Sequence, residues 1–221
     1  TLFTDLAELG AFGFGVPEQY GGAGVTDFRY NMILSEEAYR LGVGPALLGP
    51  ALQADICLPY FLSASGEQRD RWLPGIVRGE FVTAIAMTEP GTGSDLCGIA
   101  TKAVRDGDDY VLDGSKTFIT NGINADLVVV AVRTGAHRHR GLSLIVVARD
   151  TPGFERGRNL AKVGLHAQDT AELFFAGARV PAANLLGAEG SGFAQLTANL
   201  TQERLSVAVG AVAGAATALD W

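Results

Sequence analysis

A glycine-rich loop flanked by hydroxyl groups is the segment with the clearest capacity for chemistry. Residues 86–95 read AMTEPGTGSD, with Gly91 and Gly93 between the hydroxyls of Thr88 and Ser94. Closely spaced glycines allow several backbone N–H groups to point at one phosphate or carbonyl oxygen. The glycine spacing is not that of a dinucleotide-binding fingerprint, and no strand–helix–strand pattern surrounds it. Taken alone, the loop fits either an anion-binding turn or an ordinary tight turn between two strands.

A second chemical signal is the segment 116–122, which reads KTFITNG. Its composition predicts a strand that ends at an Asn-Gly turn. Alternation along the strand places Phe118 and Thr120 on one face. An aromatic ring beside a hydroxyl suits a flat ligand ring whose edge accepts or donates a hydrogen bond. The alternative is that Phe118 is an ordinary core residue.

Glu203 is a carboxylate on an otherwise apolar helical stripe. Leu196, Leu200 and Glu203 follow one another at steps of four and three residues, so they share one helix face. A carboxylate in water-poor surroundings gains basicity and can remove a proton from a carbon next to a carbonyl group. The alternative is that Glu203 marks the edge of an amphipathic face, which is the commoner role of a glutamate. The basic run 137–140, HRHR, predicts a solvated loop.

Three zones of different texture must position these residues. The first 80 residues read as helices separated by turns, and the last 30 return to a helical pattern from about Gly192. Pro17 and the pair Gly21-Gly22 forbid regular structure in the loop 12–24. The helices expected before residue 80 cover 28–41, 46–62 and 67–78, the last with a kink at Pro74.

Between residues 81 and 190 the sequence is rich in strand-forming residues. Short runs of such residues alternate with Gly and Asp/Asn turns, a pattern typical of a mostly antiparallel barrel or sandwich. The pair Asp106-Gly107 predicts a tight hairpin between two of the strands. The expected strands are 81–88, 102–104, 110–112, 127–132, 142–147 and 172–175.

Composition excludes several function classes. The 24 acidic and 17 basic residues give a formal charge of -7, and no dense Lys/Arg patch favours nucleic acid or an anionic membrane. Cys57 and Cys97 lie far apart without metal-ligand spacing, so we expect reduced thiols, no metal site and a cytoplasmic location. The stretch 205–219 is rich in Ala, Gly and Val and follows two charged residues, so it suits helix packing better than a membrane span.

Taken together, these motifs resemble the acyl-CoA dehydrogenase family. Their order along the chain, rather than any single motif, carries the resemblance. The long-chain branch is the most similar, through the elements GLHAQDT and QERL. The matching motifs are 13–22 GFGVPEQYGG, 68–74 QRDRWLP, 88–95 TEPGTGSD, 118–122 FITNG, 162–170 KVGLHAQDT and 179–187 RVPAANLLG.

The resemblance implies an α+β fold in three parts, with FAD held between the second and third. These are an N-terminal helical domain over 1–80, a middle β-barrel domain over 81–190 and the start of a C-terminal helical bundle over 191–221. Phe118 stands where many members have Trp, and Thr120 is expected near flavin N5. The implied cofactor-binding residues are Ile85, Ala86, Met87, Thr88, Gly93, Ser94, Phe118, Ile119 and Thr120.

The resemblance also assigns the catalytic base. Long-chain and isovaleryl-type members carry it on this helix, directly before an Arg, as Glu203 stands before Arg204. Other members place it far downstream. Thr201 departs from the Pro expected in long-chain relatives, and Ala194 from a bulkier residue. The implied substrate-binding residues are Ser94, His139, Arg140, Ala194, Thr201, Gln202 and Arg204.

The implied reaction is the α,β-dehydrogenation of acyl-CoA thioesters, with long chains as the expected substrates. Electrons would pass to an electron-transfer flavoprotein, and the protein would be a homo-oligomer, a tetramer or a dimer. The rival hypotheses are an acyl-CoA oxidase on the same scaffold and a truncated, non-catalytic subunit. Since the chain begins at Thr1 and stops at Trp221 within helical patterns, we expect a piece of a longer polypeptide.

Overall fold

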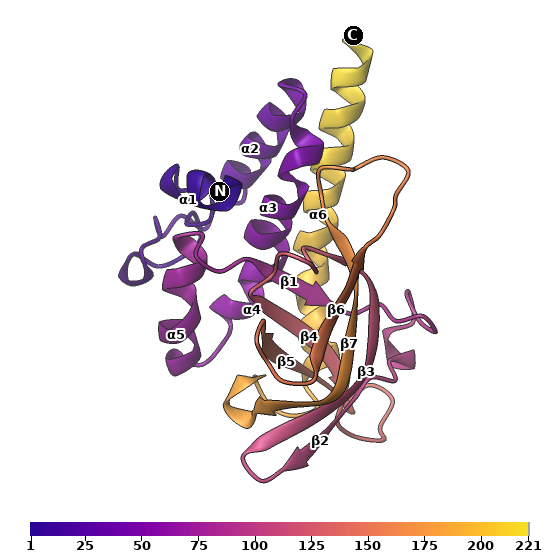
Figure 1. Cartoon of the computed structure of the whole chain (residues 1–221). Helices are drawn as coiled ribbons and strands as arrows, with labels where there is room; N and C mark the ends of the chain where they lie inside the picture. Colours follow the sequence, from indigo (N-terminus) through magenta and orange to yellow (C-terminus); the bar gives the residue numbers. More distant parts are fainter. Residues whose placement is uncertain (221) are drawn as a thin grey trace.

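The computed structural model describes residues 1–220, and Trp221, the last residue of the predicted third domain, lies outside the described part. Helices occupy the first 80 residues and form one layer beside a curved sheet (Figure 1). The predicted helices 28–41 and 67–78 are confirmed, the second by α5, which contains Pro74. The helices are α1 (Leu2–Glu8), α2 (Arg29–Arg40), α3 (Leu48–Ala51), α4 (Leu58–Leu62) and α5 (Gly66–Val77), with 3₁₀ turns at Glu18–Tyr20 and Gly44–Leu47.

The predicted helix 46–62 is continuous, but its middle is wound as a π-helix. Over η3 (Leu52–Cys57) the spacing of the backbone hydrogen bonds widens. The Leu58 N–H, for example, donates to the Gln53 carbonyl, five residues earlier. Gln53 is fully buried, accepts a hydrogen bond from the Thr83 N–H at 2.9 Å and donates to the Ile76 carbonyl. The π-helical segment therefore fixes the helical layer to the first strand and to α5.

The eight strands form a sheet in the order β6-β7-β3-β2-β4-β5-β8, and β1 pairs with β4. Most pairs are antiparallel, as predicted, while β4 pairs in parallel with β1 and β2. The hairpin at Gly107 is confirmed, because β2 and β3 pair up to Asp106 and Asp109. The strands are β1 (Thr83–Ala86), β2 (Lys102–Asp106), β3 (Asp109–Thr120), β4 (Leu127–Arg133), β5 (Leu142–Ala148), β6 (Phe154–Asn159), β7 (Thr170–Pro181) and β8 (Leu185–Leu186).

The predicted barrel is wrong in one respect: the sheet does not close. Among residues 1–220, β6 and β8 end the strand order and do not pair with each other. The sheet nevertheless curls, since alternate residues of β4 enter two different cores. Val129 and Ala131 pack with the helical layer, while Val128 and Val130 pack inside the curl against β3 and β7. Burial on both faces explains why this strand is apolar at almost every position.

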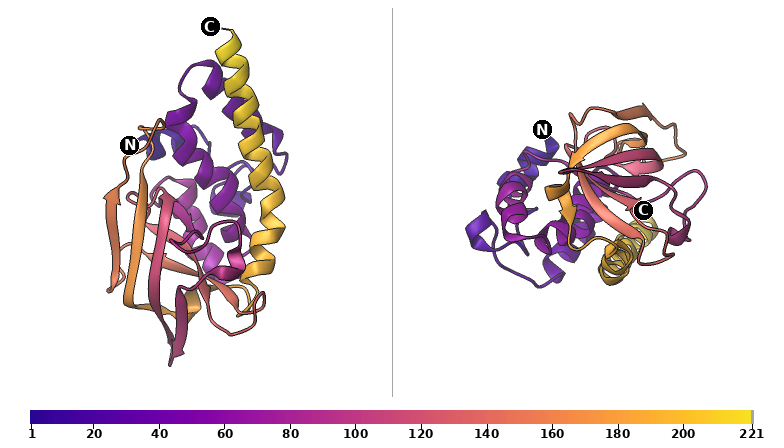
Figure 2. Two further views of the ribbon diagram at one scale, coloured as in Figure 1. Left: turned by 90° about the vertical axis from the view of Figure 1, so that its right-hand side faces the viewer. Right: turned by 90° about the horizontal axis from the view of Figure 1, so that it is seen from below.

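The long helix α6 (Gly192–Leu219) runs along both layers (Figure 2). Near its start Leu196 packs into the core shared with the sheet. Further along, Gly210 and Gly214 lie against the ring of Tyr39 on α2, where an added Cβ would come within 3.2–3.3 Å of that ring. These small residues allow the two helices to approach closely. Within residues 1–220, no helix combines the length and apolar character that a membrane span requires.

Candidate active site

Glu203 lies in the middle of α6 with its side chain turned into the protein. Its exposure is only 9%, and its Oε1 accepts a hydrogen bond of 2.8 Å from the Tyr60 hydroxyl on α4. Burial raises the pKa of Glu203, and the Tyr60 hydrogen bond acts in the opposite direction. Glu203 is thus buried, as is Leu196 of the same helical stripe. A buried carboxylate with raised basicity is the form that proton abstraction requires.

A second buried carboxylate fixes the stretch of α6 around Glu203. The Asp55 side chain accepts hydrogen bonds from Ser206 at 2.5 Å and from Asn31 of α2 at 2.7 Å. The backbone carbonyl of Asp55 accepts a third hydrogen bond, from the Gln202 side chain at 2.8 Å. Gln202 and Ser206 stand on either side of Glu203 in the sequence, so both flanks of the carboxylate are held by one point on the π-helix.

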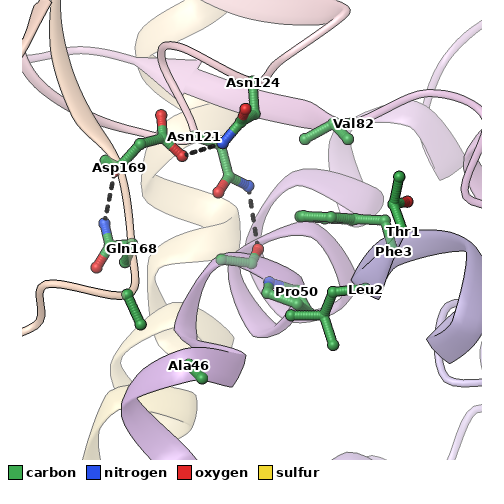
Figure 3. A pocket seen from close by; sticks show the side chains of 12 residues that line it. Thr1, Leu2, Phe3, Ala46, Pro50, Val82, Asn121, Asn124, Gln168 and Asp169 are labelled. Atoms are coloured by element: carbon green, nitrogen blue, oxygen red, sulfur yellow. Dashed lines mark hydrogen bonds between the residues drawn. The ribbon is translucent and has the colours of Figure 1, made fainter.

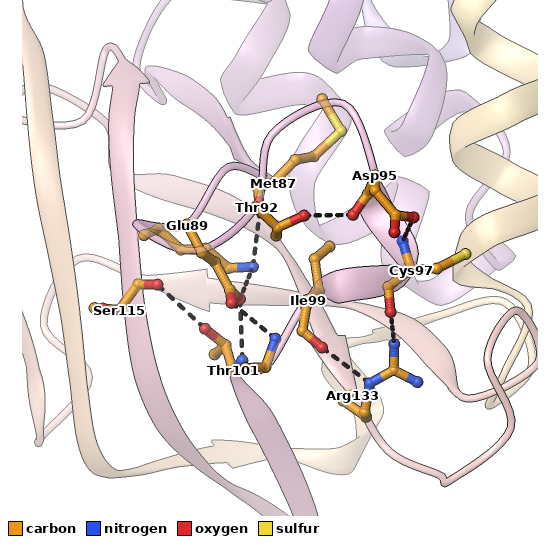
Figure 4. Close-up of polar contacts among 11 residues, drawn as sticks. Met87, Glu89, Thr92, Asp95, Cys97, Ile99, Thr101, Ser115 and Arg133 are labelled. Atoms are coloured by element: carbon orange, nitrogen blue, oxygen red, sulfur yellow. Dashed lines mark hydrogen bonds and ion pairs between the residues drawn. The ribbon is translucent and has the colours of Figure 1, made fainter.

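The glycine-rich loop is fixed by a buried ion pair at its start (Figure 4). Glu89 is 7% exposed and accepts hydrogen bonds from the backbone N–H groups of Ala100 and Thr101, at 2.7 and 3.0 Å. Lys116 of β3 is fully buried, and its Nζ donates to Glu89 Oε1 at 2.8 Å and to the Met87 carbonyl at 3.1 Å. One carboxylate thus joins the end of β1, the entry to β2 and the middle of β3.

The far end of the loop is also held. The Asp95 side chain accepts the Cys97 N–H at 3.1 Å, and the Arg133 guanidinium donates to the carbonyls of Cys97 and Ile99 (Figure 4). Between these ends the glycines stay open, because a Cβ built on Gly93 would meet no atom within 4 Å. The loop therefore has fixed ends and an uncovered apex.

Phe118 leaves its ring outside the protein. It is 67% exposed, whereas its neighbour Ile119 is 3% exposed. The backbone of Phe118 has φ 59°, at an irregularity in the pairing of β3 with β7. Thr120 Oγ1 accepts a hydrogen bond from the Gln168 amide at 2.8 Å. The Thr117 N–H donates to the Thr88 carbonyl, which places this strand beside the end of β1.

The predicted substrate residues do not all lie together. The ring of His139 packs edge-on against Phe193 of α6, with ring centres 4.8 Å apart, so the basic loop contacts the start of α6. Arg140 and Ser94 are exposed. On α6, Gln202 among the predicted substrate residues forms a side-chain hydrogen bond to the helical layer, to the Asp55 carbonyl. The remaining members of that predicted set are exposed on α6: Ala194, Thr201 and Arg204.

Two of the cavities among residues 1–220 lie beside these elements, and Glu203 lines neither of these two. The larger, about 410 Å³, lies between Phe3, Pro50 and the polar side chains of Asn121 and Asp169 (Figure 3). Asn121 Nδ2 donates to the carbonyls of Gly49 and Thr83, at 3.0 Å each. The smaller cavity, about 270 Å³, has a wall that is mostly aromatic and aliphatic and includes Phe12, Phe14, Phe28, Leu58 and Leu62.

Sequence reasoning missed four residues that shape this region: Asp55, Tyr60, Glu89 and Lys116. Glu89 and Lys116 lie within the two motifs but were given no role there, and no local pattern marks Asp55. Tyr60 offered a weak signal, since a buried tyrosine normally requires a partner for its hydroxyl. Its partner, however, lies 143 residues away.

Comparison with known proteins identifies the architecture. Residues 1–80 match the model of the acyl-CoA dehydrogenase N-terminal domain, and residues 84–178 match that of the acyl-CoA dehydrogenase middle domain. A crystal structure of an acyl-CoA dehydrogenase from Geobacillus kaustophilus aligns with a TM-score of 0.94 and 55% identity, covering 98% of this chain and 57% of that one.

Curated relatives agree with this assignment. The mitochondrial long-chain specific acyl-CoA dehydrogenase of Sus scrofa is 43% identical over 94% of this chain and 48% of its own length. The cyclohex-1-ene-1-carbonyl-CoA dehydrogenase of Geobacter metallireducens is 42% identical over 97% of this chain and 56% of its own length. The chain thus spans about half the length of the curated relatives it matches. Its two family domains, its fold and the motifs within them show that the chain belongs to the acyl-CoA dehydrogenase family.

Proposed function

We propose that the full-length protein is an FAD-dependent dehydrogenase that introduces an α,β double bond into acyl-CoA thioesters, with Glu203 as its base. The observation that carries the proposal is the environment of Glu203. Its carboxylate is buried, has a raised pKa and accepts a hydrogen bond from Tyr60. The helix that carries Glu203, α6, contacts both layers. Acyl-CoA dehydrogenases are flavoproteins that depend on FAD. Removal of the proton on the α carbon of a thioester requires a base of this kind.

The residues present fit a flavin. Phe118 offers an exposed ring, and the apex of the glycine-rich loop has open space where a larger residue would put a side chain. The Thr88 carbonyl accepts a hydrogen bond from the Thr117 N–H, whereas the Thr88 N–H donates to no acceptor among the described residues. A free backbone donor, an exposed aromatic ring and an open glycine-rich loop are therefore available close to one another on β3 and the segment after β1. We propose that Ile85–Thr88, Gly93, Ser94 and Phe118–Thr120 hold FAD.

Each of the site residues then has its own role. Glu203 takes the α proton of the thioester on its carboxylate, and a bound FAD would supply the acceptor for the β hydrogen and its electron pair. Burial of Glu203 keeps water away from the carboxylate and maintains its basicity. The buried pair of Lys116 and Glu89 keeps the backbone at the end of β1 rigid, so that its donors are preorganised.

Acyl chain length is the finer part of the proposal. We propose a preference for long chains, supported by the position of Glu203 on α6 and by the long-chain relatives. The family as a whole is broader. Relatives of this chain are named for isovaleryl-CoA and cyclohex-1-ene-1-carbonyl-CoA, and solved relatives for glutaryl-CoA and butyryl-CoA. Rates of flavin reduction with acyl-CoA of increasing chain length measure this preference directly.

An electron-transfer flavoprotein is the proposed acceptor, and a homo-oligomer the proposed assembly. A solved structure titled as the electron transferring flavoprotein of Acidaminococcus fermentans contains a chain that aligns with a TM-score of 0.90 and 36% identity. Rapid reoxidation of the reduced flavin by oxygen would instead indicate an acyl-CoA oxidase.

The Glu203→Gln variant of the full-length protein tests the base. The substitution keeps shape but removes basicity, so anaerobic flavin bleaching by acyl-CoA should slow by about 10²- to 10⁴-fold. Glu189→Gln is the matched control, because Glu189 also accepts a tyrosine hydroxyl, from Tyr110 at 2.7 Å, but lies outside the proposed site. Bleaching at the wild-type rate in the Glu203→Gln variant would place the base elsewhere.

A further inference from the structure

The hydroxyl of Tyr60 faces the carboxylate of Glu203 across the interface between α4 and α6. Tyr60 is fully buried, and the O···O distance to Glu203 Oε1 is 2.8 Å. We propose that Tyr60 is a positioning residue, whose hydroxyl immobilises one carboxylate oxygen of Glu203, presents the other for proton transfer and sets the pH range of the base. This inference rests on the proposed role of Glu203 and names a residue that acts through it.

The direction of the hydrogen bond is fixed by charge. Burial, followed by the charge of Glu203, raises the pKa of Tyr60, so the phenol keeps its proton and donates to the carboxylate. Glu203 Oε2 accepts no hydrogen bond from the described residues and is not among the fully enclosed unpaired atoms. The two oxygens are therefore unequal: one is held by Tyr60, and the other is free for proton transfer.

Few other ionisable groups face this carboxylate. The helical segments opposite α6 contribute Tyr60, the Asp55 carboxylate, which is bonded to Ser206 and Asn31, and the fully buried thiol of Cys57. Burial, together with the smaller effect of the Glu203 charge, raises the pKa of Cys57 to about 12. On α6 itself, Arg204 is exposed. β5 contributes no ionisable side chain, and Tyr39 of α2 packs further along, at Gly210. Among residues 1–220, Tyr60 is thus the hydrogen-bonding group that lowers the pKa of Glu203 against the effect of burial.

The surrounding contacts make Tyr60→Phe a narrow perturbation. Asp55 holds Gln202 and Ser206 on either side of Glu203, so removing one hydroxyl leaves α6 anchored. The ring of Tyr60 can stay in place as phenylalanine. The substitution therefore removes one hydrogen bond to a charged oxygen and little else.

The expected effect has a definite sign. A hydrogen bond donated to a carboxylate stabilises its charged form, so its loss raises the pKa of Glu203, by roughly one to two units. Proton abstraction needs the ionised carboxylate. The acidic limb of the pH–rate profile should therefore move to higher pH by the same amount. Below both limbs the variant should be about 10- to 100-fold slower than wild type, while the two rates should converge at high pH.

The test uses full-length holoenzyme and two readouts. The infrared band of the protonated Glu203 carboxyl, identified by its loss in Glu203→Gln, is titrated without substrate. Anaerobic flavin reduction by acyl-CoA is measured across the same pH range. Tyr110→Phe is the control, because it deletes another tyrosine–glutamate hydrogen bond, to the exposed Glu189, and should move neither readout. Replacing Tyr60 with 3-fluorotyrosine, a stronger donor, should shift both midpoints to lower pH.

The outcomes separate this inference from the proposed function. A slow Glu203→Gln variant together with unshifted midpoints in Tyr60→Phe overturns the role of Tyr60 and leaves Glu203 as the base. A fast Glu203→Gln variant overturns the base assignment itself. If Tyr60→Phe does not fold, the 3-fluorotyrosine protein decides, since an unchanged titration of Glu203 in it contradicts the inference.

Discussion

Replacing Lys116 with methionine should be among the most damaging single changes to the glycine-rich loop. The ammonium group is fully buried, and its loss leaves the 7%-exposed Glu89 carboxylate with two backbone donors and no cation. Removing one partner of a buried pair typically costs about 3–5 kcal/mol. With about 2–4 °C per kcal/mol for chains of this size, the unfolding midpoint should fall by roughly 6–20 °C. Lys102→Met, at an exposed lysine on β2, is the control and should change little.

The pH dependence makes the prediction sharper. Burial alone would raise the pKa of Glu89, but the Lys116 charge and the hydrogen bonds from Lys116, Thr101 and Ala100 lower it below the ordinary 4.5. In wild type, the stability contributed by Glu89 is therefore complete above about pH 4.5 and is lost as the pH falls through its folded-state pKa. In Lys116→Met the positive charge that lowers the pKa of Glu89 is gone, so burial keeps that pKa high. Protonation of Glu89 then removes the unpaired buried charge.

The destabilisation of Lys116→Met relative to wild type should consequently be largest at neutral pH and shrink towards pH 4. Urea unfolding of both proteins at pH 7 and pH 4, followed by far-UV circular dichroism, measures this difference. A loss below about 1 kcal/mol at pH 7, or an equal loss at both pH values, would refute the reasoning that the pair is a coupled, buried interaction.

Two further predictions concern the loop and the turn behind it. Gly93→Val should lower FAD content without lowering the unfolding midpoint of the apoprotein, because its Cβ meets no protein atom; full flavin occupancy would contradict the proposed cofactor residues. Asn121→Gly should destabilise the protein by about 1–3 kcal/mol in urea unfolding, since two buried carbonyls lose their donor while the backbone at φ 60° stays accessible. Asn121→Ala should cost more, and an equal cost would show that backbone strain is unimportant there.

The local elements could be predicted from the sequence because their signals are local. Asp106-Gly107 requires a tight turn wherever it stands between two strand-like runs, and the structure has that hairpin. The spacing of Leu196, Leu200 and Glu203 likewise places them on one helix face, although it leaves open whether Glu203 lies inside that face or at its edge. In both cases the residues that decide the outcome lie within one or two turns of each other.

The rest depends on contacts between distant segments. Whether the sheet closes depends on its edge strands, β6 and β8, and no residue pattern in either strand indicates that they will not pair. Tyr60 stands in an apolar stretch that predicts only a buried helix, and its partner is known only once α4 and α6 are packed together. Lys116 belonged to a recognisable motif, but the sequence does not show that its ammonium is enclosed, because Glu89 and the strand crossing that covers them come from elsewhere.

The π-helix over Leu52–Cys57 makes the aim of Tyr60 a matter of residue count rather than residue identity. A wider turn accommodates one residue more than an α-helix would over the same rise, and each residue of an α-helix rotates the chain by about 100°. If this segment kept all its residues but took up ordinary α winding, the side chains that follow it would turn by about that angle relative to those that precede it. Tyr60 would then point away from α6. An insertion-and-deletion scan of 52–57 could therefore retune Glu203 without altering any side chain that touches it.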